Sequence, residues 1–245
     1  MISFPPIRGL ILDLDGLLID SERWNWEAHN DVLACIGVEA LALSEMRTLA
    51  GLSDEAEAAQ IGRLRPQTAT DHAAYVDAVR QTYQQIRDRS LAPLPGVHHL
   101  LRVAHVLHLR IALASNSSLP SIDAVLHGLG IHSAFNAIAC GAEVAHGKPA
   151  PDSYLLALHR LDLEPEEALA VEDSATGLQA ACAAGLRCAV VPGVLTALHD
   201  FSTACARFGT LNELAGRLPE YAVTWPARET AAPRKVQTVA REGVA

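Results

Sequence analysis

Short apolar runs alternate with helical patterns over most of the chain. Five runs have the length and aliphatic content of buried strands: residues 8–13, 110–115, 136–140, 168–172 and 187–191. Apolar residues at helical spacing follow three of these runs and predict helices over 120–128, over 151–161 and from the region of Ser174 to about Ala184. Strands that alternate with helices of this length are typical of a parallel, doubly wound sheet with right-handed crossovers. The pattern therefore predicts an α/β fold.

A different pattern occupies residues 18–92. Apolar residues lie on one face of a helix that begins at Ser21 and stops near Gly37, and further helical stretches follow around 53–64 and 70–89. The segment A-P-L-P-G at 92–96 is the clearest break in the chain. We therefore expect an all-helical insertion over 18–92 in a core made of 1–17 and 93–225. The tail, 226–245, has little apolar periodicity, and we expect it to be poorly ordered.

Composition narrows the class of protein. Half of the 245 residues are apolar, yet no hydrophobic run approaches the length of a membrane-spanning helix. The net charge of −9 argues against a nucleic-acid groove, which needs a basic stripe. The chain starts without a charged leader and apolar region, and its five cysteines lack C-x-x-C spacing. We therefore expect a cytoplasmic protein without disulfides or zinc, and we take a monomer as the expectation, although nothing in the sequence reports oligomeric state.

Two aspartates follow the first apolar run, in the sequence I-L-D-L-D-G. If the strand continues through them, Asp13 and Asp15 emerge on the same face. Two carboxylates this close repel each other, and they are tolerated where a cation neutralises them or where one stays protonated. Gly16 then permits a sharp turn and lets its backbone N–H approach an anion. The alternative interpretation is a strand end followed by a solvated Asp-Gly turn.

Polar residues also follow other predicted strands, where ligands bind in doubly wound sheets. Ser115 and Asn116 stand at a strand–helix junction, which suits a phosphate cradle, although both types also favour a helix N-cap. Lys148 precedes a helix in G-K-P and would neutralise phosphate charge and keep a nucleophile ionised. Glu172 and Asp173 offer the oxygen ligands that Mg²⁺ prefers. We expect these side chains to meet at one edge of the sheet.

Four segments resemble the haloacid dehalogenase-like hydrolase superfamily, in its beta-phosphoglucomutase-like branch. They are D-L-D-G-L-L-I-D-S-E, A-S-N-S, G-K-P-A-P-D and V-E-D-S-A-T-G, and they stand in the family's order and spacing. The resemblance covers about residues 8–220. It implies a Rossmann-like core with a helical cap inserted after the first strand. It also implies a Mg²⁺-dependent activity on a small phosphorylated metabolite.

The same resemblance implies a role for each matching residue. Asp13 would be the nucleophile that becomes an aspartyl phosphate, and Asp15 would be the general acid and base. Mg²⁺ would be held by the carboxylates of Asp13 and Asp173, by the backbone carbonyl of Asp15, and by Glu172 directly or through water. The phosphate-binding residues would be Gly16, Ser115, Asn116 and Lys148.

Departures from the family pattern favour one activity over its rivals. Mutase members carry a histidine just after the first motif and an arginine in the cap, where this chain has Asn25 and Asp54. We therefore expect a phosphatase of a sugar or polyol phosphate rather than a sugar phosphomutase. Asp15 argues against metal-free 2-haloacid dehalogenation. Phosphonoacetaldehyde hydrolases need a lysine in the cap that forms a Schiff base, and residues 18–92 contain no lysine, which excludes that activity. A non-catalytic phospho-acceptor or sugar-phosphate sensor is the rival from another class; Asp15 disfavours it, because an acid–base group shortens the life of an aspartyl phosphate.

Four histidines, at positions 98, 99, 105 and 108, crowd one expected helix. His98, His105 and His108 can share a face of this helix, but no carboxylate lies beside them in the sequence to complete a metal site. We therefore expect a solvated helix surface rather than a transition-metal site.

Overall fold

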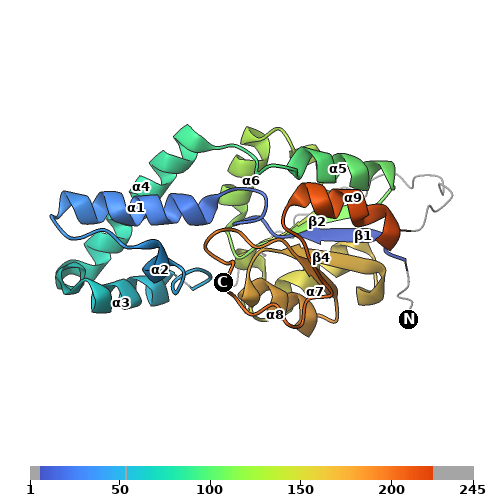
Figure 1. Ribbon diagram of the computed structural model, residues 1–245. Helices are drawn as coiled ribbons and strands as arrows, with labels where there is room; N and C mark the ends of the chain where they lie inside the picture. The colour runs from blue at the N-terminus through green and yellow to red at the C-terminus, as the bar shows by residue number, and fades with distance from the viewer. Residues whose placement is uncertain (1–5, 53, 223–245) are drawn as a thin grey trace, which may run out of the picture.

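The computed structural model describes residues 6–52 and 54–222, and in this part a six-stranded parallel sheet forms the centre of the fold (Figure 1). The strands are β1 (Gly9–Leu12), β2 (Arg110–Ala114), β3 (Ala137–Ala139), β4 (Ala168–Glu172), β5 (Arg187–Val190) and β6 (Ala206–Arg207). They lie in the order β3-β2-β1-β4-β5-β6, and every neighbouring pair is parallel. This order is doubly wound, with its switch point between β1 and β4. The predicted fold class is confirmed.

Helices cover both faces of the sheet, which explains why its strands are apolar runs. In β1, Leu10 and Leu12 pack in one core cluster and Ile11 packs in the other. The helices α5 (Val97–Val106), α6 (Leu119–Gly128) and α9 (Leu211–Tyr221) pack against the first cluster. The helices α7 (Asp152–Leu161) and α8 (Ala175–Ala183) pack against the second. Consecutive strand residues point to opposite faces of the sheet. Because alternate residues of β1 belong to different core clusters, both faces of the sheet are buried.

Four further helices lie beyond the carboxyl end of β1, at the blue to turquoise end of Figure 1. They are α1 (Ser21–Cys35), α2 (Leu43–Met46), α3 (Asp54–Leu64) and α4 (His72–Ser90). The two chain segments that join them to the core lie side by side, because the N–H of Leu94 donates a hydrogen bond to the carbonyl of Leu18 (2.8 Å). Short 3-10 helices complete the fold: η1 (Pro66–Asp71), η2 (His132–Ala134), η3 (Gly141–Glu143) and η4 (Pro165–Glu167).

Several elements differ from the sequence expectations. The expected helix over 70–89 is divided between η1 and α4, whereas the first helix ends at Cys35, close to Gly37 as expected. The short helix α2, the two-residue strand β6 and the helix α9 were not predicted. The expected disordered tail and the side chain of Asp54 lie outside the described residues.

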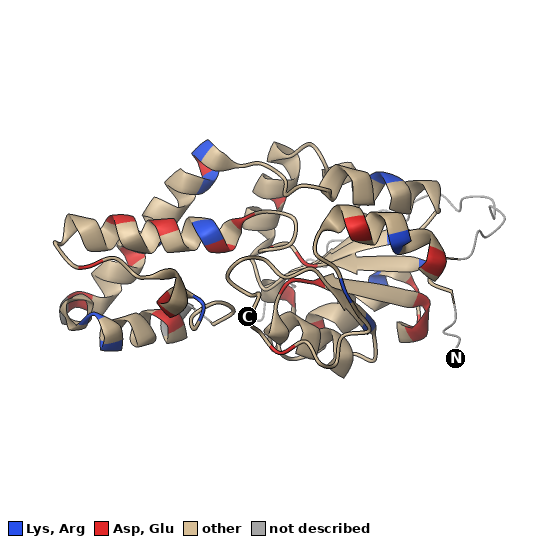
Figure 2. Ribbon diagram, viewed as in Figure 1, with Lys and Arg blue, Asp and Glu red and all other residues tan. Residues whose placement is uncertain are grey.

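The distribution of basic residues and the length of the helices agree with the expectations drawn from composition. Figure 2 shows Lys and Arg scattered over the described elements rather than gathered along one of them. No helix in the described ranges is long and apolar enough to cross a bilayer. All five cysteines are free thiols.

Gly96 stands directly before α5, at the end of the segment that leads from α4 back to the core. A substitution at Gly96 tests how closely α9 packs against this junction. The φ of Gly96 is +101°, and a Cβ there would lie 2.7 Å from the backbone nitrogen of Asn212 in α9. Gly37 also has a positive φ, +69°, but nothing lies within 4 Å of a Cβ built there. We expect Gly37→Ala to cost about 1–2 kcal/mol for the left-handed backbone alone. Gly96→Ala should cost a further 1–3 kcal/mol, roughly, for the forced contact.

Urea unfolding of the two variants and the wild type measures this difference. Equal losses of stability for Gly37→Ala and Gly96→Ala would show that α9 does not restrict the junction.

Candidate active site

Six of the residues singled out from the sequence converge at the carboxyl ends of β1, β2 and β4. They are Asp13, Asp15, Ser115, Lys148, Glu172 and Asp173. The strand pairing continues one residue past β1, because the N–H of Asp13 donates to the carbonyl of Val171 (3.1 Å). The register of β1 against β4 thus places Asp13 beside the Glu172–Asp173 pair.

Three carboxylates form the buried centre of the site. Asp13, Glu172 and Asp173 are 6%, 1% and 2% exposed, and one oxygen of each lies within 4.8 Å of the others. Burial raises the pKa of Asp13 well above its usual value, and the charges of Glu172 and Asp15 add to this effect. The pKa of Asp173 is raised for the same reason, first by burial and then by Asp13 and Glu172. Such a cluster is tolerated only where a cation neutralises it or where one of the carboxyl groups stays protonated.

Lys148 supplies a positive charge to this cluster. Its Nζ donates to Oδ1 of Asp13 (2.5 Å) and to Oε1 of Glu172 (2.6 Å), and it lies 5.0 Å from the centre of the Tyr154 ring. Burial by itself lowers the pKa of Lys148, but the charges of Asp13 and Glu172 outweigh burial and raise it. The lysine therefore stays charged and offsets part of the carboxylate repulsion.

Asn116 holds the loop that carries this lysine. Its Oδ1 accepts a hydrogen bond from the backbone N–H of Lys148 (2.8 Å), and a Cβ on Gly147 would lie 2.8 Å from the same oxygen. The structure thus gives Asn116 a contact that positions Lys148. Its direct binding of phosphate, expected from the sequence, stays a prediction.

Asp15 lies apart from the three buried carboxylates. Its Oδ2 accepts hydrogen bonds from the hydroxyls of Ser115 (3.2 Å) and Ser117 (2.8 Å). The helix-cap interpretation of this segment is wrong, because α6 begins at Leu119 with Ser118 at its N-cap position. Ser115 and Ser117 instead fix the orientation of the Asp15 carboxylate.

Hydroxyl groups that the sequence reasoning missed complete the hydrogen bonding of the carboxylates. Tyr154 donates to Oε1 of Glu172 (2.6 Å), and Ser174 donates to its other oxygen (3.3 Å). Thr196 donates to Oδ2 of Asp173 (3.3 Å). Tyr154 follows G-K-P-A-P-D-S directly, so its place in the motif was a usable signal. Thr196 lies in a loop after β5 and carried none.

Two glycines let the carboxylates approach the backbone. Gly16 has φ +77°, and a Cβ there would lie 2.3 Å from Oδ2 of Asp173. A Cβ on Gly177 would lie 1.9 Å from Oε1 of Glu172. The N–H of Gly16 already donates to Ile19 (3.0 Å) and to Ser21 (3.1 Å), so the structure assigns it a packing role. Phosphate binding by Gly16 stays a prediction.

A cavity of about 650 Å³ lies between this site and the helices α1, α3 and α4. Its volume is within the range of small-molecule pockets. Residues at the sheet end of the cavity include Asp15, Asn116, Ser117 and Lys148, and those on the helical side include Glu22, Asn25, His29, Glu57 and Tyr75. The cavity therefore joins the carboxylate site to a second set of polar groups.

The second set is a hydrogen-bonded cluster that the sequence did not reveal. Asn25 donates from Nδ2 to both oxygens of Glu57 (2.9 and 3.0 Å). His29 lies with Nε2 3.6 Å from Glu57 and with Nδ1 2.8 Å from the hydroxyl of Tyr75. Glu57 and His29 are 7% and 3% exposed. Asn25, singled out as a departure from the mutase pattern, thus holds a buried acid against the cavity.

Comparison with known proteins agrees with this geometry. A family model described as haloacid dehalogenase-like hydrolase matches residues 10–191. The chain belongs to this family. The protein CbbY of Cereibacter sphaeroides is 34% identical over 220 residues, which cover 86% of this chain and 95% of that protein. Hexitol phosphatase B of Escherichia coli K12 is 30% identical over 213 residues, or 86% of this chain and 96% of that protein.

Solved structures show the same relationship. A crystal structure of CbbY from Rhodobacter sphaeroides in complex with phosphate is 32% identical, with a TM-score of 0.69 over 85% of this chain and 96% of that one. A putative beta-phosphoglucomutase from Thermotoga maritima is 25% identical, with a TM-score of 0.72 over 87% and 99%. The resemblance drawn from the four sequence motifs is confirmed, and this haloacid dehalogenase-like chain is a hydrolase.

The buried position of Glu22 predicts that the stability of this hydrolase depends on pH. Burial, and after it the charges of Glu57, Asp15 and Asp20, raises the pKa of Glu22 from 4.5 to about 7. A carboxyl group whose pKa is raised by folding stabilises the protein below its unfolded pKa, and this contribution is lost as the pH rises through the folded value. Glu22→Gln should therefore match the wild type near pH 4 and exceed its stability above pH 7, by up to about 3 kcal/mol.

Chemical denaturation across this pH range measures the difference. The exposed Glu27→Gln on the same helix is the control, and its difference from the wild type should not follow this pH course. A constant difference between Glu22→Gln and the wild type from pH 4 to pH 8 would contradict the assignment.

Proposed function

We propose that this hydrolase is a Mg²⁺-dependent phosphatase that cleaves a small sugar or polyol phosphate through an aspartyl phosphate on Asp13. The observation that carries the proposal is the placement of Asp13 between a charged Lys148 and two acidic neighbours, beside a cavity lined by Asp15. The names of two relatives support the substrate class. They are hexitol phosphatase B and the fructose-1-phosphate phosphatase YqaB of Escherichia coli, the second 32% identical over 180 residues.

The donor set at the site fits Mg²⁺. Asp13, Glu172 and Asp173 offer only oxygen atoms, which suits a hard cation. Three buried carboxylates face a single lysine, so Lys148 alone does not balance their charge, and burial together with the neighbouring carboxylates raises the pKa values of Asp13 and Asp173. Mg²⁺ would be held by these two carboxylates, by the backbone carbonyl of Asp15, and by Glu172 directly or through water. When bound, it supplies positive charge that stabilises the transferring phosphoryl group.

The residues of the chain divide the chemistry between them. A carboxylate oxygen of Asp13 forms a bond to phosphorus while the bond to the leaving alkoxide breaks, and Asp15 gives that alkoxide a proton. Asp15 then takes a proton from water, whose oxygen bonds to phosphorus and releases Asp13 and inorganic phosphate. Ser115 and Ser117 hold Asp15 in place for both proton transfers. Lys148 offsets charge on the phosphoryl oxygens.

We propose that residues 18–92 act as a cap over the core formed by 1–17 and 93–225. The hydrogen bond between Leu94 and Leu18 keeps the two linkers together, so both can act as one hinge. Closure would exclude water from the reacting phosphate.

The five cysteines are free thiols, as expected for a protein in a reducing cytoplasm, and we place the enzyme there.

The cap side of the cavity favours a substrate with hydroxyl groups. The carboxylate of Glu57 accepts hydrogen bonds, so it can receive a substrate hydroxyl as well as the amide of Asn25. Its negative charge would repel a second phosphate. A mutase needs a cationic group at the position of Asn25 to grip a bisphosphate, and Asn25 supplies none; the cationic residues of the cavity, Arg80 and Arg87, lie on α4. The pairing of Asn25 with Glu57 therefore favours hydrolysis of a monophosphate.

A specific observation supports a second candidate, the hydrolysis of a sugar bisphosphate. A mutant of CbbY from Rhodobacter sphaeroides was solved in complex with xylulose-(1,5)bisphosphate; it is 31% identical with a TM-score of 0.69. The α4 side of this cavity carries Arg80 and Arg87, which are suited to bind phosphate oxygens. The two candidates share the reaction at Asp13 and differ in the group bound opposite it.

Release of inorganic phosphate from a panel of sugar, polyol and nucleotide monophosphates, with Mg²⁺ present, tests the reaction. We expect turnover of at least one hexose or hexitol phosphate, and less than about 1% of it for Asp13→Asn, because removal of a covalent nucleophile costs orders of magnitude in rate. Asp13→Asn should unfold at or above the wild-type temperature, since it removes one of three repelling charges. Substantial turnover by a folded Asp13→Asn would refute Asp13 as nucleophile.

Glu57→Gln tests the selection between substrates. We expect kcat/KM for the best polyol phosphate to fall about tenfold, as for one lost charge-assisted hydrogen bond, with p-nitrophenyl phosphate unaffected. Turnover of a sugar bisphosphate should rise relative to the monophosphate.

Three outcomes would point elsewhere. A wild-type preference for the bisphosphate that Arg80→Gln abolishes would select the second candidate. Conversion of beta-glucose 1-phosphate to glucose 6-phosphate faster than phosphate release, with a trace of glucose 1,6-bisphosphate, would indicate a mutase. A stable phosphoenzyme without turnover would indicate a sensor.

A further inference from the structure

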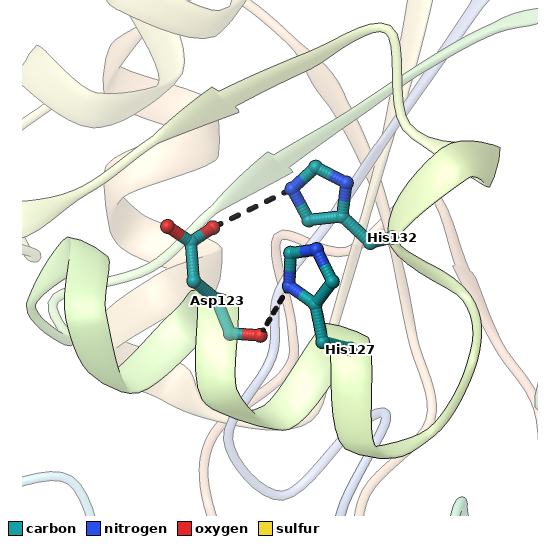
Figure 3. Close-up of side chains that lie close together, drawn as sticks. All are labelled: Asp123, His127 and His132. Atoms are coloured by element: carbon teal, nitrogen blue, oxygen red, sulfur yellow. Dashed lines mark hydrogen bonds and ion pairs between the residues drawn. The ribbon is translucent and has the colours of Figure 1, made fainter.

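A cluster of two histidines and an aspartate lies at the end of α6, on the chain segment between β2 and β3 (Figure 3). Asp123 and His127 are four residues apart in the helix, so they occupy the same face. The third member, His132, begins η2. Gly130, with φ +67°, turns the chain after the helix and brings His132 back beside His127.

The hydrogen bonding of His127 leaves one of its nitrogens available to a ligand. Its Nδ1 lies 2.8 Å from the backbone carbonyl of Asp123. A carbonyl oxygen can only accept a hydrogen bond, so Nδ1 is the donor, and the lone pair of the neutral imidazole is on Nε2. A histidine whose other nitrogen donates to a backbone carbonyl has the tautomer and orientation of a typical metal ligand.

The remaining donor atoms are close and able to move. Nε2 of His132 lies 3.5 Å from Oδ1 of Asp123, and the imidazoles of His127 and His132 stack with centroids 4.2 Å apart. One ligand atom from each of the three residues lies within 4.8 Å of the others. The side chains of Asp123 and His132 are 42% and 41% exposed, so small rotations meet no packed neighbour on their solvent side.

We propose that Asp123, His127 and His132 form a binding site for a transition-metal dication of the Zn²⁺, Ni²⁺ or Co²⁺ type. Tetrahedral coordination with metal–nitrogen distances near 2.0–2.1 Å places ligand atoms about 3.3 Å apart. The ligand atoms now lie within 4.8 Å of one another, so the cluster reaches this spacing when rotation of its exposed side chains brings them up to about 1.5 Å closer. Two imidazoles and a carboxylate would leave a fourth position for water.

This site differs in chemistry from the acidic site at the ends of β1 and β4. The acidic site has oxygen donors only and is buried, whereas two of the three donors here are imidazole nitrogens. Imidazole favours the borderline transition ions over Mg²⁺, so this site should not bind Mg²⁺, whereas excess Mg²⁺ competes with a transition ion for the oxygen-only site. The metal would fasten the last turn of α6 to η2, and the opposite end of α6 carries Ser121, which lines the cavity.

Calorimetric titration of the metal-free full chain with Zn²⁺, in excess Mg²⁺, tests the proposal. We expect one Zn²⁺ per chain to bind in the micromolar range. His127→Gln and Asp123→Asn should each weaken binding by at least about tenfold, since even loss of an outer-shell partner costs this much. The control is His146→Gln, which alters an exposed histidine–aspartate pair (His146–Asp152, 3.4 Å) that lacks a second histidine.

The spectrum of the Co²⁺ complex separates this site from the exposed cysteines 35, 182 and 205. Nitrogen and oxygen ligation gives visible bands without the near-ultraviolet charge-transfer band of a thiolate. Far-ultraviolet circular dichroism checks that each variant is folded. The proposal is overturned if Zn²⁺ binds only at millimolar concentration, if the Co²⁺ spectrum shows thiolate ligation, or if His127→Gln and Asp123→Asn bind as tightly as His146→Gln.

Discussion

Electrostatic repulsion among Asp13, Glu172 and Asp173 is the constraint around which the candidate active site at the carboxyl ends of β1 and β4 is built. The adjacent, parallel pairing of β1 and β4 brings the three carboxylates together, and the helices on both faces of the sheet bury them. Charged groups in such surroundings are stable only when oppositely charged or hydrogen-bonding partners reach them. Lys148 contacts two of the three, and hydroxyl groups from other segments contact Glu172 and Asp173.

This requirement explains features that lie well outside the carboxylates. The loop before α7 must bring Lys148 inward, and Asn116 at the end of β2 holds that loop by accepting its backbone N–H. Asp15 avoids the buried cluster and is oriented by two serines beside the cavity. Two aspartates two residues apart therefore occupy unlike environments, and separation of this kind allows one to act as nucleophile and the other as acid and base.

The sequence predicted the parts of the site that depend on local order along the chain. Asp13, Ser115 and Glu172 each follow an apolar run, and strand ends of a parallel sheet meet at one edge, so their convergence followed from topology. Contacts between distant segments left no such signal. Thr196 reaches Asp173 from a loop, and the pairing of Asn25 with Glu57 depends on how α1 packs beside α3.

The same limit applied to smaller elements and to the histidines. Strand β6 has two residues, too few to show a period, and its partner β5 determines its place. The sequence drew attention to four histidines near position 100, where no carboxylate joins them. His127 and His132 escaped notice because the turn at Gly130 brings them together.

The central claim is that Lys148 and Mg²⁺ together balance the buried carboxylates. Its most direct test is thermal unfolding of the wild type and Lys148→Met, each with EDTA and with saturating Mg²⁺. Without metal, Lys148→Met should lose about 3–5 kcal/mol, the cost of leaving buried charges without a partner. Mg²⁺ should restore most of that loss and raise Tm more in the variant than in the wild type. A metal-free Lys148→Met as stable as the wild type, or a loss that Mg²⁺ leaves unchanged, would contradict the account.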